Sequence, residues 1–97
     1  MSAPLRRFIC EHQVVPDLTE ERIREIHARV DEGLRVLYTF SNLDEKCMYS
    51  VIESRDRRSV EKLFESLRVQ CDCIMEIEVQ GEGTDRIQDL RPGKKAA

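Results

Sequence analysis

The order of secondary structure predicted for this chain indicates an α+β fold, with two helices on one face of a four-stranded antiparallel sheet. The main observation is a hairpin, in which residues 36–40 and 46–52 alternate as strands around the polar turn 41–45. An amphipathic helix is predicted on each side of this hairpin, and one further strand at each end. The resulting order, β-α-β-β-α-β, is that of the ferredoxin-like plait.

The first strand, residues 5–13, is followed by a helix with a clear start. Pro16 ends the strand, because proline has no amide donor and keeps the residue before it extended. Thr19 is a good N-cap, and Glu20 and Glu21 complement the helix dipole in the first turn. The apolar residues of this helix recur at helical spacing, at Ile23, Ile26, Val30 and Leu34.

The second half of the chain repeats the pattern of helix and strand. The second helix is predicted to begin after Asp56 as N-cap, with an apolar stripe at Val60, Leu63, Phe64 and Leu67. The last strand is predicted over residues 71–80. Its alternation predicts a core-facing set of Cys71, Cys73, Met75, Ile77 and Val79. The more solvent-exposed set is then Asp72, Ile74, Glu76, Glu78 and Gln80.

Composition predicts one soluble domain. We expect a ferredoxin-like domain over residues 1–80 and a flexible tail over 81–97, because Gly81 and Gly83 form a hinge and little beyond them is apolar. The net charge of −3 and the few aromatic residues disfavour nucleic acid and anionic membranes as partners. No apolar run follows Arg6 and Arg7, so we expect no signal peptide, a cytoplasmic protein and reduced cysteines.

Four short runs, at residues 8–11, 39–40, 44–49 and 72–77, together resemble a family of small bacterial ferredoxin-like proteins. Most members of that family are uncharacterised, and at least one binds nickel. The resemblance covers roughly residues 6–80. It implies a homodimer in which the two open sheet faces meet, as in the dimeric α+β barrels.

Several positions match the family pattern and others depart from it. The matches are the strand-one glutamate (Glu11), the Cys-x-Tyr pair (Cys47 and Tyr49), and the step into the last strand (Asp72 and Ile74), while Thr39-Phe40 stands where Ser-Tyr is usual. The departures are a leucine in the second helix where the family often has histidine (Leu63), a histidine where arginine is commoner (His12), and extra residues at 54–56.

A metal site is predicted at the end of the first strand. His12, Glu11 and Asp17 lie close together in sequence, and imidazole with carboxylate suits nickel, copper or zinc. The resemblance makes nickel the candidate ion. The alternative is that His12 is a partly exposed residue at a strand end and that Glu11 pairs with a nearby arginine. Because adjacent residues on a strand face opposite ways, we expect only one of the two to be a ligand unless the strand bends there.

The remaining candidate residues are thiols and a phenol. Cys47 and Tyr49 share a strand face, so they could form the floor of a binding pocket for a ligand or cofactor, and the alternative is that they serve only in packing. Cys71 and Cys73 could join Cys10 and Cys47 in a four-thiolate metal site, and the alternative is that the cysteines fill the core.

Three functions compete, and no motif predicts catalytic residues. The first is a non-enzymatic homodimer that binds a metal ion or a small ligand on the open sheet face. The second is a small dimeric α+β barrel enzyme, monooxygenase- or isomerase-like, with a substrate pocket inside the barrel. The third is an assembly or regulatory domain whose sheet only contacts another copy.

Overall fold

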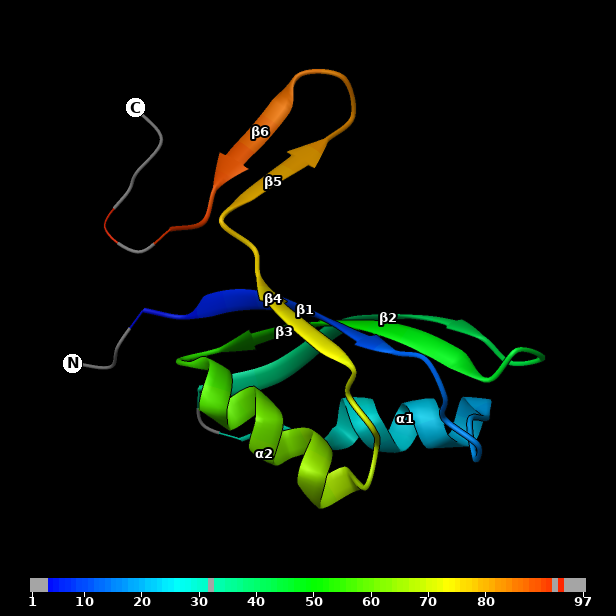
Figure 1. Cartoon of the computed structure of the whole chain (residues 1–97). Helices are drawn as coiled ribbons and strands as arrows, with labels where there is room; N and C mark the ends of the chain where they lie inside the picture. The colour runs from blue at the N-terminus through cyan, green and yellow to red at the C-terminus, as the bar shows by residue number, and fades with distance from the viewer. Residues whose placement is uncertain (1–3, 32, 92, 94–97) are drawn as a thin grey trace.

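The computed structural model describes residues 4–31, 33–91 and 93, which form an α+β fold (Figure 1). The elements follow in the order β1 (Arg6–His12), α1 (Glu20–Ala28), β2 (Leu34–Asn42), β3 (Cys47–Ser54), α2 (Arg57–Leu67), β4 (Cys73–Glu76), β5 (Val79–Glu82) and β6 (Arg86–Asp89). The first four strands form an antiparallel sheet of order β2-β3-β1-β4, and β5 pairs with β6 in a second sheet. The predicted α+β class and four-stranded antiparallel sheet are confirmed.

Both helices begin at the predicted caps. The Thr19 hydroxyl accepts a hydrogen bond from the Arg22 amide at 3.1 Å, and the Asp56 carboxylate accepts one from the Ser59 amide at 2.8 Å. These bonds satisfy amide donors that a first helical turn leaves without a backbone partner. Among the described residues, neither helix is long and apolar enough to cross a lipid bilayer.

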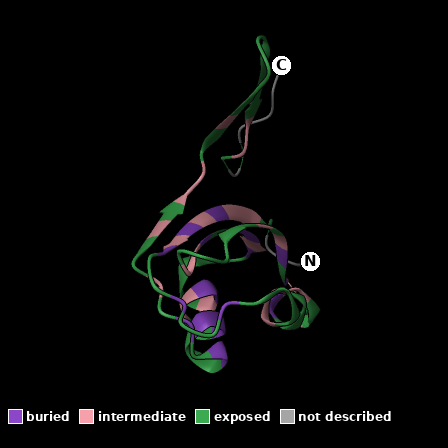
Figure 2. Ribbon diagram, turned by 90° about the vertical axis from the view of Figure 1, so that its right-hand side faces the viewer, coloured by how far each residue is buried: buried purple, intermediate pink, exposed green. Residues whose placement is uncertain are grey.

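The core lies between the four-stranded sheet and the two helices, which cover one of its faces (Figure 1). Figure 2 shows buried positions alternating with less buried ones along the sheet. The strands contribute Phe8, Cys10, Leu34, Val36, Met48 and Ile52 to this core, and the helices contribute Ile26, Val60, Leu63, Phe64 and Leu67. The apolar stripe predicted for α2 is therefore confirmed as its buried face.

The orientation predicted for the last strand is wrong. β4 covers Cys73–Glu76, and its register with β1 places Ile74 opposite Cys10 and Cys73 opposite Glu11. Ile74 therefore packs against the core, while Cys73 and Met75 are exposed on the other face. Cys71 also packs against the core, because the irregular backbone before β4 interrupts the alternation.

The C-terminal segment contains the β5–β6 hairpin, which stands away from the larger sheet on the side opposite the helices (Figure 1). The predicted domain boundary between residues 80 and 81 lies within β5. The hairpin is tied to the domain by Arg7, whose guanidinium donates to the Gln80 side-chain oxygen at 2.8 Å. Residues 92 and 94–97 of the predicted tail lie outside the described residues.

Candidate functional site

The sheet face opposite the helices, here called the open face, carries two rows of side chains that cross all four strands. Cross-strand pairing aligns the first row in the order Tyr38, Val51, Ile9 and Met75. The second row, one step along the strands, is Phe40, Tyr49, Glu11 and Cys73. The four largest exposed side chains of these rows, Tyr38, Phe40, Tyr49 and Met75, are each 45% to 60% exposed. The open face is therefore an apolar surface that the described chain leaves uncovered.

A β-bulge in β2 puts two of the aromatic rings on this face. Val36 pairs with the core residue Ile52, but the register then shifts, and Tyr38 pairs with Val51. Because side chains alternate along a strand, Tyr38 would point into the core with Val36 without the extra residue. The bulge instead turns Tyr38 and Phe40 outward, where their rings stack with centroids 6.2 Å apart. Simple alternation could not predict this arrangement.

One polar pair lies within the apolar surface. The Tyr49 hydroxyl donates a hydrogen bond to the Glu11 carboxylate at 3.1 Å across paired strands. The carboxylate raises the pKa of Tyr49, because it favours the protonated phenol. The two residues border a hollow of about 220 Å³, which is lined by Ile9, Cys10, Glu11, Tyr49, Cys73 and Met75. This hollow can hold a small apolar group and offers a carboxylate to a hydrogen-bond donor.

His12, the central residue of the predicted metal site, is fully buried. Its Nδ1–H donates to the Gln70 carbonyl at 2.9 Å, since a carbonyl can only accept, and Nε2 then accepts from the Ser50 hydroxyl at 2.8 Å. The imidazole packs against the Phe64 ring, with centroids 4.5 Å apart. Both ring nitrogens are thus engaged, and the imidazole belongs to the core.

The structure does not bring the three predicted metal ligands together. His12 points into the core, whereas Glu11 lies on the open face, as alternation along β1 requires. Asp17 lies in the loop after β1, where its carboxylate pairs with Arg22 at 3.1 Å. Within the described residues, no group of three histidine, cysteine, aspartate or glutamate side chains is placed to hold a metal ion.

The four cysteines are likewise divided between the two faces of the sheet. Cys10 and Cys71 lie on the core side, and Cys73 is exposed on the open face. Cys47, half-buried at the start of β3, pairs with Asn42 and does not line the hollow that Tyr49 borders. The four thiols therefore do not converge, and Tyr49 is the member of the predicted Cys47–Tyr49 pair that borders the hollow.

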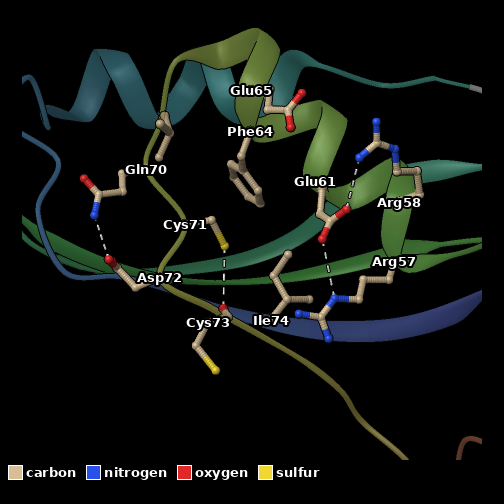
Figure 3. A pocket seen from close by; sticks show the side chains of 11 residues that line it. Arg57, Arg58, Glu61, Phe64, Glu65, Gln70, Cys71, Asp72, Cys73 and Ile74 are labelled. Atoms are coloured by element: carbon tan, nitrogen blue, oxygen red, sulfur yellow. Dashed lines mark hydrogen bonds and ion pairs between the residues drawn. The ribbon is translucent and has the colours of Figure 1, made fainter.

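A second cleft, of about 450 Å³, lies between α2 and the segment that leads into β4 (Figure 3). Two arginines at its rim, Arg57 and Arg58, each lie 3.6 Å from a Glu61 carboxylate oxygen. Glu61 compensates part of their charge, and two more carboxylates, Glu65 and Asp72, line the same cleft, so the arrangement does not favour an anion. Cys71 lines this cleft, beside Phe64 and Ile74 (Figure 3).

Comparison of the chain with protein-family models, with curated proteins and with solved structures gives no match. The resemblance to the family of small bacterial ferredoxin-like proteins therefore stays a prediction.

The burial of His12 predicts a loss of stability in mild acid. Desolvation lowers the pKa of His12 below its ordinary value of 6.5, so the unfolded chain binds the proton more readily than the folded protein. The contribution of neutral His12 is complete above pH 6.5 and declines as pH falls from there toward the folded-state pKa. We expect the melting temperature to fall as pH drops below 6.5.

The carboxylates of Asp56 and Asp72 affect the stability of the fold in a separate, more acidic range of pH. Hydrogen bonds from amide groups lower the pKa of both, so their contributions are lost only below about pH 4. Melting curves of the wild type and of His12→Gln across this range test the assignment. An equally steep decline in the variant between pH 6.5 and pH 5 would show that another group is responsible.

Proposed function

We propose that this protein is a non-enzymatic homodimer of ferredoxin-like fold, in which two open faces pack together and enclose a small ligand. The observation that carries the proposal is the pair of side-chain rows across all four strands, with large apolar groups exposed and one carboxylate–phenol pair among them. An apolar surface of this kind on a soluble domain marks an interaction site.

The fold part of the proposal is supported by the arrangement of the first six elements. The central strands are β3 and β1, the edges are β2 and β4, and both helices cover the same face. A ferredoxin-like plait has two helices on one face of such a sheet and leaves the other face free, so this arrangement supports the proposed fold. The β5–β6 hairpin is an addition beyond that pattern.

A second copy is the occupant that the open face fits best. The surface is flanked on one side by charged residues that form ion pairs, in which Glu53 pairs with Arg35 at 3.0 Å and with Arg7 at 3.6 Å. An apolar centre with a polar border is the usual anatomy of a protein interface. Two identical faces related by a two-fold axis cover each other without any further component.

The hollow beside Glu11 and Tyr49 indicates the chemistry of the ligand. Its walls are mainly apolar, with Ile9 and Met75 among them, and its main polar feature is the Glu11 carboxylate. A small aromatic or aliphatic molecule with one hydrogen-bond donor matches this lining. The hollow of the second copy, facing this one, would close the site. It would then exclude water from the hydrogen bond between the ligand and the Glu11 carboxylate.

Indole and benzofuran form a matched pair of probes, because they share a shape and only indole has an N–H donor. We expect indole to shift the amide resonances of Glu11, Tyr49 and Cys73 in NMR titrations and to bind about tenfold more tightly than benzofuran, as a hydrogen bond to a carboxylate implies. Glu11→Leu should abolish the preference, whereas the exposed helix variant Glu21→Leu should retain it. Equal affinities in the wild type, or shifts confined to the helices, would refute the proposed ligand site.

A further inference from the structure

Cys10 and Cys71 form a thiol pair that the proposed function does not use. Cys10 is fully buried on β1, opposite Ile74 of β4, and Cys71, in the segment before β4, packs against the same core beside Ile74. The Cys71 thiol donates to the Cys73 carbonyl at 3.5 Å (Figure 3), and the two thiols interact with each other. Cys71 is only half-buried and lines the cleft beside α2 (Figure 3). One thiol is thus open to a small reagent, and the other is buried in the adjoining core.

The surroundings favour the two thiols in different states. The interaction with Cys10 lowers the pKa of Cys71, and the charge of Arg57 on the rim of the same cleft acts in the same direction. The same interaction, together with burial, raises the pKa of Cys10. Cys71 is therefore more readily deprotonated than Cys10, and the thiolate is the state that reacts with oxidants.

We propose that Cys10 and Cys71 are a redox modification site, in which a hydroperoxide oxidises Cys71 and Cys10 then closes an intramolecular disulfide. In the first step the Cys71 thiolate attacks one peroxide oxygen. An S–O bond forms and the O–O bond breaks, so that Cys71 becomes a sulfenic acid while the peroxide is reduced and leaves as an alcohol or water. In the second step the Cys10 sulfur attacks the Cys71 sulfur. The S–S bond forms, the S–O bond breaks, and hydroxide leaves as water with the Cys10 proton.

Two features of the fold support this assignment. Cys10 contacts the Ser50 hydroxyl, which is itself bonded to His12, so its thiol is held in place by the buried polar network. The disulfide would also tie β1 to the segment that enters the edge strand β4. Cys71, the residue that is oxidised first, lines the cleft beside α2 and not the hollow of the proposed ligand site, so its oxidation does not depend on the proposed dimer or ligand.

Peptide mapping after treatment with hydrogen peroxide tests the proposal. Trypsin releases Cys10 in residues 8–22, Cys47 in 47–55, and both Cys71 and Cys73 in 69–86. We expect non-reducing mass spectrometry of the oxidised, untagged protein to show residues 8–22 linked to residues 69–86. The Cys73→Ser variant should give the same link, which assigns it to Cys71, and Cys71→Ser should give none.

A second variant separates the two steps. In Cys10→Ala, the Cys71 sulfenic acid has lost its buried partner and should be trapped by dimedone. If Cys10→Ala does not fold, the peptide map of oxidised Cys73→Ser still shows whether Cys71 is linked to Cys10. A Cys71–Cys73 link, a link between chains through Cys73, or a Cys71 thiol that stays reduced while Cys73 is oxidised would overturn the proposal.

Discussion

Changing Phe40 to aspartate is expected to separate the proposed dimer into folded monomers. Phe40 is 60% exposed in the single chain and lies in the second row of the open face, next to Tyr49. If a second copy covers this face, the variant buries one carboxylate per chain without a partner, which costs several kcal/mol. The dissociation constant should rise at least about a thousandfold, as sedimentation equilibrium can measure.

Val30→Asp is the matched control for this change. Val30 is also a large exposed apolar residue, at 66%, but it follows α1 and lies outside the open face. This variant should keep the association of the wild type, and circular dichroism should show that both variants are folded. If Phe40→Asp associated as tightly as the wild type, the open face would not be the interface.

Changing His12 to alanine is expected to lower the free energy of unfolding by about 3 to 5 kcal/mol, with no metal ion present. The variant loses the contact with the Phe64 ring and leaves the Gln70 carbonyl and the Ser50 hydroxyl without their buried partner. A loss of this size is a large fraction of the total stability of a small domain. Urea denaturation of the metal-free protein measures it.

His27→Ala is the control, because it removes the other histidine of the chain. His27 is half-buried, and its Nε2 makes one hydrogen bond of 3.1 Å, to the Thr39 hydroxyl. Its loss should cost about 1 kcal/mol or less. A His12→Ala variant that is as stable as the wild type without metal, and that differs only in metal retention, would restore His12 to the role of a ligand.

Local sequence signals predicted the parts of the fold that depend on neighbouring residues. The caps Thr19 and Asp56 are confirmed because an N-cap needs only a side-chain oxygen and an amide three residues later. The apolar stripe of α2 is confirmed because helical periodicity is a short-range pattern. These elements in their order were sufficient to predict the four-stranded antiparallel sheet.

The features that shape the candidate site depend on contacts between distant residues. The bulge after Val36 is defined only by pairing with β3, so alternation alone could not place Tyr38 and Phe40 on the open face. The register of β4 with β1 decides which of its side chains lie on the core face of the sheet, and it places Ile74 there rather than Cys73. The sequence also gave no sign that Ser50 and Gln70 would satisfy His12 inside the core.

The central claim is that the open face of one copy packs on the open face of another. Its most direct test is an isotope-filtered NMR experiment on a mixture of labelled and unlabelled protein, which detects only contacts between chains. We predict intermolecular contacts among the side chains of the two rows, from the rings of Tyr38, Phe40 and Tyr49 to methyl groups such as those of Ile9 and Met75. Intermolecular contacts confined to α1, α2 or the β5–β6 hairpin, or no such contacts at millimolar concentration, would contradict the claim.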